Sequence, residues 1–565
     1  MLDDELPLQC MYRWERERAE RIFLTQPFGG GNVRDWTWSQ AAHEVRRMAA
    51  YLKSQGWEPG ARVAILSRNC AWWILADLSI WMAGYVTVPV YPSLKPQSVR
   101  QILEHSGARG CFIGPTDEKE SASSGVPSGV LSIRFPNVPA NGGMAWQAVL
   151  ESTAPMQDNP ARPAEDLATI IYTSGTTGTP KGVMHSFAAF CYDAKRLATL
   201  LGATGGQRAL SYLPLAHIVE RAGLEMPAIQ LGSRLFFTEG IETFLADLQR
   251  ARPTLFLSVP RLLLKFQQGV FEKVPKEKLD KLLRLPIIDR YTKRRILRQL
   301  GLNTVVHAAC GAAPLPTEIL LWYRNLGLDL AEGYGMTETL ITHLPQPGHM
   351  RPGYVGAALE GVEVKLGANN ELLVKSPMNM LGYYNDPQGT RDAFTSDGFF
   401  RTGDVVQLDP DGQLKIIGRL KEQFKTSKGK FVVPAPIESK LMAHSDVEAC
   451  CLMGSGHASP FAIVLLSAEA RRRCTTPDAW NAIELSLRSQ LDQVNSQLDP
   501  HERVQFIAIA DGPWSVSNGL MTPTLKIKRT LLENHYQTLV DNWERTNCPV
   551  VWESAPGASA AHSKN

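Results

Sequence analysis

The sequence lacks paired cysteines and has no large excess of charge of either sign. Its nine cysteines include no CxxC spacing, and only Cys450 and Cys451 lie close together. An odd number of scattered thiols argues against a metal cluster or a disulfide framework and favours a reducing compartment, so we expect a cytoplasmic protein. The formal net charge is only +3. Because large nucleic-acid binders carry a concentrated basic excess, we expect no nucleic-acid partner.

Long hydrophobic runs are also scarce. The longest covers residues 71–90 and could cross a bilayer by its length, but it contains Asp77 and breaks at Gly84 into a β-rich run. We interpret it as a helix, a turn and a strand instead of a membrane span. The first ten residues are acidic and lack the basic and apolar regions of a signal peptide, so we expect no export. The last residues are small and polar, and 546–565 is expected to form a disordered tail.

A chain of 565 residues is too long for one compact core. Between 62 and 330, short apolar runs alternate with helical stretches, which is typical of an α/β fold with largely parallel sheets. The clearest runs are VAIL (63–66), TVPV (87–90), GCFIG (110–114) and TLFLSV (254–259). Short alternating segments between about 350 and 418 predict a small antiparallel sheet or barrel. We therefore expect an N-terminal domain over 1–420 that includes this β-rich subdomain, and a C-terminal domain over 421–545.

The stretch YTSGTTGTPKG, residues 172–182, combines glycines, hydroxyl side chains and one lysine. It follows the apolar run LATII, which predicts a buried strand, so the loop leaves a sheet edge where ligands bind in α/β folds. Glycines let backbone amides approach a ligand and Lys181 adds a point charge, so we predict a phosphate-binding loop. The spacing is not that of a Walker loop, because Lys181 follows Pro180. A solvated linker has a similar composition and stays an alternative.

Four further clusters have a similar character. They are GAAP (311–314), EGYGMTET (332–339), TGD (402–404) and TPTLKIKR (522–529). Each has an ordinary explanation when taken alone, such as a turn, a core aromatic or a solvated helix start. The five clusters together, in this order, need a common explanation.

In this order the clusters resemble the AMP-forming acyl-adenylate enzymes, the superfamily of acyl-CoA synthetases, adenylation domains and beetle luciferases. The resemblance runs from about residue 36 to 536, and YTSGTTGTPKG is its most specific signature. Within the superfamily the sequence is most similar to long-chain acyl-CoA synthetases. Four stretches carry this similarity: SYLPLAHIVER (211–221), PTLFLSVPRLL (253–263), FKTSKGKFVVPAPIE (424–438) and NGLMTPTLKIKR (518–529).

The resemblance implies an α/β fold with a large N-terminal domain of two mixed α/β subdomains and a small β-barrel-like subdomain, followed by a smaller, mobile C-terminal α/β domain. It also implies an ATP-dependent fatty acid–CoA ligase that uses Mg²⁺. In such an enzyme a medium- to long-chain fatty acid attacks the α-phosphate of ATP, pyrophosphate leaves, and the thiol of CoA displaces AMP from the acyl-AMP. Catalysis of the first step rests on positioning and electrostatic stabilisation.

The resemblance also implies roles for individual residues. Catalytic roles are implied for Lys526 between the acyl carboxylate and the α-phosphate, for Thr337 at the α-phosphate and for Glu338 as the Mg²⁺ ligand. The residues implied to hold the β- and γ-phosphates are Thr173, Ser174, Gly175, Thr176, Thr177 and Lys181. The residues implied to contact adenosine are Gly311, Ala312 and Tyr334 at the base, with Asp404 and Arg419 at the ribose. His217 is implied at the acyl entrance, and Lys421 as the hinge of the C-terminal domain.

Several alternatives stay open. A structural role competes with the acyl-site role of His217, and Lys528 is a rival of Lys526 for the catalytic role. Glu422 stands where many members of the family have Asp, and Thr524-Leu525 stands where many have Ser-Gly, which is usual for the long-chain branch. The acceptor thiol could belong to a carrier protein instead of CoA, and a non-catalytic nucleotide or acyl-lipid binder is a further alternative. Oligomeric state and acyl length preference are not readable from the sequence.

The segment 273–298 is unusually basic. Ten basic residues are interleaved with Leu and Ile against three acidic ones. A solvated helix pair broken at Pro286 is the simpler interpretation. A basic amphipathic stretch can also lie on an anionic membrane surface, so peripheral membrane contact is the second one. A nucleic-acid site here has little support, because Tyr291 is the only aromatic residue in the segment.

Overall fold

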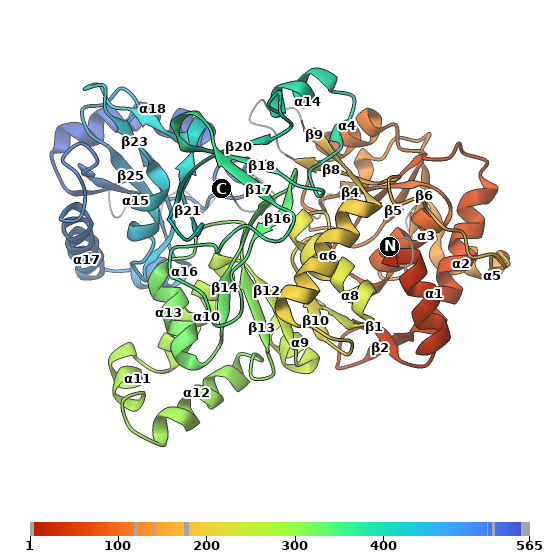
Figure 1. Cartoon of the computed structure of the whole chain (residues 1–565). Coiled ribbons are helices and arrows are strands. Elements are labelled where there is room, and N and C mark those ends of the chain that lie inside the picture. The colour runs from red at the N-terminus through yellow and green to blue at the C-terminus, as the bar shows by residue number, and fades with distance from the viewer. Residues whose placement is uncertain are drawn as a thin grey trace.

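The computed structural model describes residues 5–117, 122–139, 142–173, 180–516, 518–522 and 526–554. Figure 1 shows the N-terminal elements, in red to yellow, at one end of the molecule and the C-terminal elements, in blue, at the other. Green strands, among them β17, β18 and β20, lie between these two ends. The molecule combines helices with parallel and antiparallel sheets, so the predicted α/β class is confirmed.

The largest sheet has eight strands in the order β19-β9-β8-β4-β3-β5-β6-β7. Strands β3 to β8 run parallel, and β9 and β19 are antiparallel additions at one edge. The strands are β3 Arg62–Leu66, β4 Val86–Val90, β5 Gly110–Ile113, β6 Leu131–Arg134, β7 Met144–Ala145, β8 Leu167–Thr173, β9 Lys181–Ser186 and β19 Gly382–Tyr383. The associated helices are α2 Trp38–Ser54, α3 Ala71–Met82, α4 Pro96–Ser106, α5 Trp146–Ser152 and α6 Phe187–Leu201.

Helix α3 explains the long apolar run. All of its residues are buried, and the chain then turns and enters the fully buried strand β4. The predicted helix, turn and strand over 71–90 are therefore confirmed. Among the described residues, no helix combines the length and the apolar character that a membrane crossing requires.

Two smaller sheets adjoin the large one. A four-stranded sheet has the order β10-β11-β1-β2, and a three-stranded parallel sheet has the order β12-β13-β14. Their strands are β1 Ile22–Pro27, β2 Val33–Thr37, β10 Arg208–Ser211, β11 Arg234–Phe237, β12 Leu255–Ser258, β13 His307–Cys310 and β14 Leu330–Glu332. The helices around them are α1 Pro7–Glu17, α7 Ile218–Glu220, α8 Met226–Leu231, α9 Phe244–Ala251, α10 Pro260–Lys273 and α13 Thr317–Leu326. A π-helical turn, Arg221–Glu225, joins α7 to α8.

A β-rich region follows. Strands β17, β18, β20 and β21 form an antiparallel sheet in that order, and β15 pairs with β16. Their bounds are β15 Tyr334–Met336, β16 Leu340–His343, β17 Glu363–Leu366, β18 Glu371–Lys375, β20 Phe400–Leu408 and β21 Leu414–Arg419, with helix α14 at Pro387–Ala393. The alternating pattern between 350 and 418 thus correctly predicted a small antiparallel sheet.

The C-terminal part is an α/β sandwich. The sheet order is β24-β25-β26-β27, and α17 and α18 bury their apolar sides in different clusters, which draw on alternate residues of β24 and β25. The strands are β22 Phe424–Lys425, β23 Phe431–Val432, β24 Val447–Met453, β25 Phe461–Leu466, β26 Ile507–Ala510 and β27 Val550–Trp552. The helices are α15 Pro434–Leu441, α16 Ala468–Arg473, α17 Pro477–Asn495 and α18 Arg529–Thr546. The boundary at 420 and 421 lies between β21 and β22 and stays a prediction as a domain boundary.

The predicted disordered tail over 546–565 is wrong for its first part. Val550–Trp552 forms β27, which pairs in parallel with β26, and Val550 and Val551 are buried. A three-residue apolar run is too short to be recognised as a strand in the sequence, and burial against a preformed sheet edge stabilises it. Residues 555–565 lie outside the described residues, and the prediction for them stays untested.

The segment 273–298 forms two helices, α11 Lys276–Leu282 and α12 Ile288–Gln299. Figure 1 shows them projecting from the body of the molecule beyond α10 and α13. Leu279 and Ile296 are buried in the same apolar cluster as residues of β12 and β13, which anchors the pair. The predicted helix pair broken at Pro286 is confirmed.

Candidate functional site

The predicted phosphate loop joins neighbouring strands of the large sheet. Thr173 is the last residue of β8 and Lys181 is the first of β9, and the two are partners in the antiparallel register. The loop therefore leaves and re-enters the sheet at a single point. Ser174, Gly175, Thr176 and Thr177 lie outside the described residues, and their phosphate contacts stay predictions.

Lys181 begins a line of contacts that leads to Glu338. Its Nζ lies 3.9 Å from Asp386 Oδ2 and 4.6 Å from the ring centroid of Tyr383. The Tyr383 hydroxyl donates to Glu338 Oε1 at 3.0 Å. Burial raises the pKa of Glu338 above its usual value. The predicted phosphate lysine and the predicted metal ligand are thus joined through Tyr383, which no motif in the sequence marks.

Thr337 is buried beside Glu338. Its carbonyl oxygen lies 2.6 Å from His185 Nε2, and this nitrogen is the donor because a carbonyl oxygen can only accept. Burial lowers the pKa of His185 to about 4, so the ring is neutral near pH 7. This hydrogen bond fixes the backbone that presents Thr337 and Glu338.

Gly311 and Ala312 lie at the carboxyl ends of parallel strands. They follow β13, and Gly333 follows its neighbour β14. A Cβ atom at Gly311 would lie 3.3 Å from the Gly333 carbonyl oxygen, so this close approach favours glycine. Glu332 Oε1 accepts a hydrogen bond from the Leu315 N–H at 3.0 Å, which ties the loop after β13 to the end of β14. Such a crevice at strand carboxyl ends is where α/β sheets bind ligands.

Tyr334, Asp404 and Arg419 form one contact group. The Tyr334 hydroxyl donates to Asp404 Oδ2 at 2.6 Å, and Arg419 Nε lies 2.8 Å from Asp404 Oδ1. Asp404 and Arg419 are register partners on β20 and β21. Burial raises the pKa of Asp404 above its usual value, although Arg419 acts against this rise. The structure therefore brings together three residues that were predicted to contact adenosine.

Lys526 lies in the electrostatic environment of this group. The loop 522–526 is closed by a backbone hydrogen bond of 2.8 Å between its ends. The Lys526 residue as a whole is exposed, but the protein around its ammonium group displaces water. This desolvation lowers the pKa of the ammonium group below the usual value, and Arg419 adds to the effect. Asp404 and Glu338 oppose it. A cation of the C-terminal part thus interacts electrostatically with carboxylates of the N-terminal part.

Contacts between α10 and the C-terminal part accompany this arrangement. Arg261 forms an ion pair with Glu448, whose other carboxylate oxygen lies 3.6 Å from an Arg471 nitrogen. Gln268 Nε2 donates to the Ser445 carbonyl oxygen at 3.0 Å. These contacts hold the C-terminal part against the N-terminal part. Lys526 is near Asp404 in this same orientation.

Lys421 and Lys528 lie outside this contact group. Lys421 is exposed in the turn Leu420–Glu422, directly after β21, and its hinge role stays a prediction. Lys528 immediately precedes α18, and its N–H donates to the Leu520 carbonyl oxygen at 2.9 Å. The electrostatic coupling to Asp404 favours Lys526 over Lys528 as the active-site cation.

His217 begins helix α7 and interacts electrostatically with Lys526. Its Nδ1 accepts a hydrogen bond from the Val219 N–H at 3.2 Å. Burial lowers the pKa of His217 to about 4, and Lys526 acts in the same direction. The capping bond agrees with a structural histidine, and the nearness of Lys526 agrees with an acyl-site residue, so both interpretations stay open.

The buried carboxylate of Glu220 holds the loop that carries His217. Glu220 Oε1 accepts from Ser211 Oγ at 2.7 Å and from the Tyr212 N–H at 3.1 Å. Asn69 supports the same loop, because its Nδ2 donates to a carbonyl oxygen of residue 213 at 2.6 Å. The stretch SYLPLAH is therefore shaped by polar side chains beneath it, and Glu220 was not predicted as one of them.

Glu220→Gln should flatten the pH dependence of stability. Burial raises the pKa of Glu220 from 4.5 to about 8. Between these values the folded chain keeps a proton that the unfolded chain has lost, so the stabilising contribution is complete below pH 4.5 and is lost as the pH rises through about 8. Glutamine stays neutral and can accept both hydrogen bonds. We expect the melting temperature of the variant to fall less between about pH 5 and pH 9 than that of the native chain. Parallel curves would contradict this assignment.

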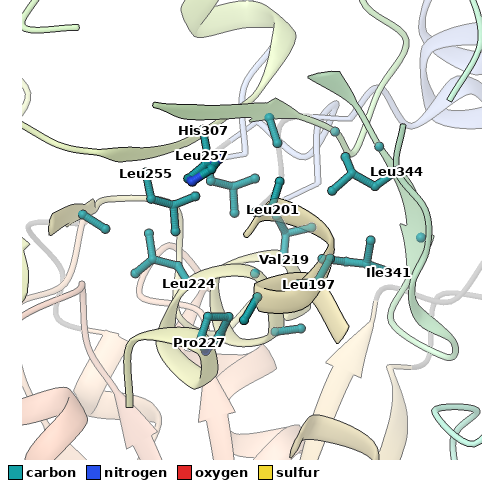
Figure 2. A pocket seen from close by; sticks show the side chains of 18 of the residues that line it. Leu197, Leu201, Val219, Leu224, Pro227, Leu255, Leu257, His307, Ile341 and Leu344 are labelled. Carbon is teal, nitrogen blue, oxygen red and sulfur yellow. The ribbon is translucent and has the colours of Figure 1, made fainter. Parts of the chain in front are cut away.

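An apolar pocket extends from the strand ends into the molecule. Gly311, Ala312 and 333–336 line one end of it. Its walls come from α6, the π-helical turn, α8 and strands β12 and β13, and Figure 2 shows their labelled side chains around a common space. The labelled wall residues are Leu197, Leu201, Val219, Leu224, Pro227, Leu255, Leu257, His307, Ile341 and Leu344. The pocket thus offers an apolar body that opens onto the polar group around Tyr334.

The direction of the pocket follows the strands. Leu255 and His307 are register partners at the amino ends of β12 and β13, whereas Gly311 follows the carboxyl end of β13. His307 is the one polar side chain labelled in Figure 2, and burial lowers its pKa below the usual value. No motif in the sequence marks these wall residues, because a pocket wall made from six separate segments leaves no local signal.

Comparison with known proteins identifies the class. The AMP-binding enzyme family matches residues 11–384, and the C-terminal domain of AMP-binding enzymes matches residues 421–546. The chain belongs to the AMP-binding enzyme family, so the resemblance stated from the motifs is confirmed. This membership supports an AMP-forming acyl-adenylate ligase as the general class.

Individual proteins of known class are similar to this chain over most of its length. The chain is 31% identical to the long-chain-fatty-acid–CoA ligase FadD15 of Mycobacterium bovis, over 94% of this chain and 95% of that protein. It is 30% identical to the peroxisomal long chain acyl-CoA synthetase 6 of Arabidopsis thaliana, over 91% of this chain and 82% of that protein. The adenylation domain of a carboxylate reductase from Mycobacterium chelonae superposes with a TM-score of 0.82 at 22% identity, covering 96% of this chain and 91% of that structure. The last similarity shows the fold.

Proposed function

We propose that this protein is an ATP-dependent ligase that activates a medium- to long-chain fatty acid as acyl-AMP, releases pyrophosphate and transfers the acyl group to CoA. One observation carries the proposal: the apolar pocket ends at 311–312 and 333–336, beside the contact group of Tyr334, Asp404 and Arg419. An apolar body with a few polar groups at one end suits an amphipathic carboxylic acid. The relatives named as long-chain ligases support the same substrate class.

The proposed first step joins the carboxylate to the nucleotide. In this step Thr173, Lys181 and the residues between them hold the β- and γ-phosphates, and Thr337 contacts the α-phosphate. Lys526 is the cation that stabilises charge developing between the fatty carboxylate and the α-phosphate. The Asp404 carboxylate accepts from the ribose hydroxyls, while Tyr334 flanks the adenine with Gly311 and Ala312. The fatty tail lies in the apolar pocket. Because the pocket holds the acyl chain, it also positions the carboxylate for reaction.

Glu338 fits a role as a magnesium ligand. Glu338 Oε1 accepts a hydrogen bond from the Tyr383 hydroxyl at 3.0 Å, and this bond fixes the carboxylate. No other side chain of the described residues forms a hydrogen bond with the second oxygen, Oε2. The described residues contain no cluster of three or more His, Cys, Asp or Glu side chains arranged to hold a metal. In the proposed complex the phosphates would therefore supply further oxygen ligands beside Glu338. When bound, Mg²⁺ would neutralise phosphate charge.

The second step requires a different arrangement of the C-terminal part. We propose Lys421 as its hinge, because this exposed residue lies in the turn between β21 and β22. Rotation there would withdraw Lys526 and bring the loop 426–430 toward the entering thiol. That loop is the connection of the β22–β23 hairpin, and the Thr426 N–H donates to the Lys430 carbonyl oxygen at 2.9 Å.

The proposal is tested by two linked assays. The full chain is mixed with ATP, Mg²⁺ and fatty acids of increasing length, and pyrophosphate release is measured, followed by thioester formation on adding CoA. Pyrophosphate release and CoA thioester with the longer acids support the proposed ligase. Pyrophosphate release without CoA thioester, but with acylation of a phosphopantetheine carrier, supports the carrier-loading alternative. No pyrophosphate with any acid refutes the ligase and leaves a non-catalytic binder. A cytoplasmic location is part of the proposal and rests on the unpaired cysteines.

Gly223→Leu should shift acyl preference toward shorter chains. Gly223 lies in the π-helical turn and lines the pocket, and a Cβ atom there would lie 2.9 Å from Leu257 Cδ2. A larger side chain would displace Leu257 or fill the pocket, so kcat/KM for long acids should fall at least about tenfold relative to short ones. The control is Gly269→Leu in α10, where a Cβ atom meets nothing within 4 Å. An unchanged ratio in the Gly223 variant would place the acyl chain elsewhere.

A further inference from the structure

The tip of the α11–α12 pair exposes apolar side chains that a solvated helix pair does not need. Leu285 is 46% exposed, Ile287 88%, Ile288 43% and Tyr291 67%. They lie at the connection between the helices and at the start of α12. Leu279 of α11 and Ile296 of α12 are instead buried in the core. The pair therefore has two sets of apolar side chains, and the protein covers the second set but not the first.

Ile287, at the tip, also has an unusual backbone conformation. Its φ is +73° and its ψ is −49°, in a region that β-branched residues rarely adopt. A glycine would relieve this strain. An isoleucine that is both strained and exposed stabilises neither the backbone nor the core, and strain of this kind accompanies functional positions.

Unpaired cations surround the apolar tip. The segment 273–298 carries ten basic and three acidic residues, an excess of seven charges that exceeds the net +3 of the whole chain. Within the part of the chain that the structure describes, Lys293 is the one cation of this segment with a carboxylate partner, Asp289 at 3.0 Å. Arg284, Arg290, Arg294 and Arg295 are all exposed. This projecting element thus presents a concentrated positive charge to solvent.

We propose that this tip docks on the surface of an anionic lipid bilayer. The apolar side chains of 285–291 would enter the headgroup region, while the surrounding lysines and arginines contact lipid phosphates, which is the composition of interfacial helices. A nucleic acid is a poorer match, because stacking needs more aromatic side chains than Tyr291. A protein partner accounts for the apolar tip but gives no reason for cations spread along both helices.

The position of the pair relates this surface to the pocket. The pair is inserted between β12 and β13, and both strands line the pocket. After α12 the chain enters β13 at His307, which lies at the amino end of the strands and far from the nucleotide end. Docking would bring the pocket-bearing part of the molecule to the bilayer. The inference stands on the α11–α12 pair alone and does not require the proposed ligase activity.

Vesicle binding by the purified full chain tests the proposal. Sedimentation is measured with vesicles of phosphatidylcholine and phosphatidylglycerol, and with vesicles of phosphatidylcholine alone. We expect binding to the anionic vesicles that weakens as salt is added, and little binding to the neutral ones. Equal binding to both, or to neither, overturns the proposal.

Two variants separate the tip from the fold. Ile287→Gly removes the exposed side chain and suits the positive φ, so it should weaken anionic vesicle binding several-fold without lowering the melting temperature. The double variant Arg294→Gln and Arg295→Gln should weaken it about tenfold. The control is Ile241→Gly, which removes an isoleucine that is 87% exposed outside the basic pair and should change nothing. Native vesicle binding by both tip variants refutes membrane docking; a change in self-association instead assigns the tip to contact between copies.

Discussion

Lys526→Ala should slow acyl-AMP formation by about 10² to 10³. The ammonium group of Lys526 interacts electrostatically with Asp404, Glu338 and Arg419. Asp404 accepts from Tyr334, which lines the apolar pocket at the end where the carboxylate and the α-phosphate would meet. Alanine removes the charge and leaves the backbone bond between residues 522 and 526 in place. The measurement is pyrophosphate release with saturating ATP and fatty acid. Thioester formation from supplied acyl-AMP should be much less affected, because the proposed rotation about Lys421 would withdraw the cation in that step.

Lys528→Ala is the matched control for Lys526→Ala. The two lysines lie two residues apart, but no interaction of Lys528 with Asp404 or Glu338 is found among the described residues. The Lys528 variant should release pyrophosphate within about twofold of the native rate. Removal of a group at the developing charge should slow this release far more. A dead Lys528 variant beside a normal Lys526 variant would reverse the assignment. Equal loss of both half-reactions in the Lys526 variant would instead indicate a folding defect, which the melting temperature would show.

Arg221→Met should lower the free energy of unfolding by about 3–5 kcal/mol, because it leaves buried carboxylates without their cation. Arg221 is completely buried, with one guanidinium nitrogen 2.5 Å from Asp77 Oδ2 and Nε 3.3 Å from Glu225 Oε2. Burial raises the pKa of both carboxyl groups, and Arg221 acts against this rise in each of them. The measurement is the first transition of chemical or thermal unfolding, since a chain of several domains need not unfold in one step.

Two companion variants make this result specific. Arg16→Met breaks the exposed Arg16–Glu17 pair, whose side chains are 72% and 48% accessible, and should cost no more than about 1 kcal/mol. Asp77→Asn in the Arg221→Met background should recover part of the loss, because it removes the charge left alone. If Arg221→Met is as mild as Arg16→Met, water or rearrangement compensates the buried charge and the network is not essential to stability.

The Arg221 network is not visible in the sequence. SYLPLAHIVER is typical of the family, but it assigns no role to Arg221, because the partner Asp77 is 144 positions away. In the sequence, Asp77 only argues against a membrane helix. The structure gives both facts one explanation, since the carboxylate in the middle of buried helix α3 needs a cation from the π-helical turn.

The residues of the site also fall into two groups, those that local sequence patterns predict and those that they do not. The placement of the phosphate loop after a strand, and of Gly311 and Gly333 at neighbouring strand ends, follows from local patterns of apolar runs and glycines. The local patterns do not mark Tyr383 and His185. Each acts through one hydrogen bond to a residue of the motif EGYGMTET, and a single polar side chain between motifs carries no periodic signal.

The sequence by itself determined the class of protein, the order of the elements and the family motifs, because strands, turns and glycine-rich loops depend on interactions between near neighbours. Only the tertiary structure decided that Lys526 interacts electrostatically with Asp404, that the apolar pocket runs along β12 and β13, and that Ile287 is exposed on a strongly basic helix pair. These features arise where segments far apart in the chain pack together, and the burial and charge that give them their chemistry do not exist until that packing is complete.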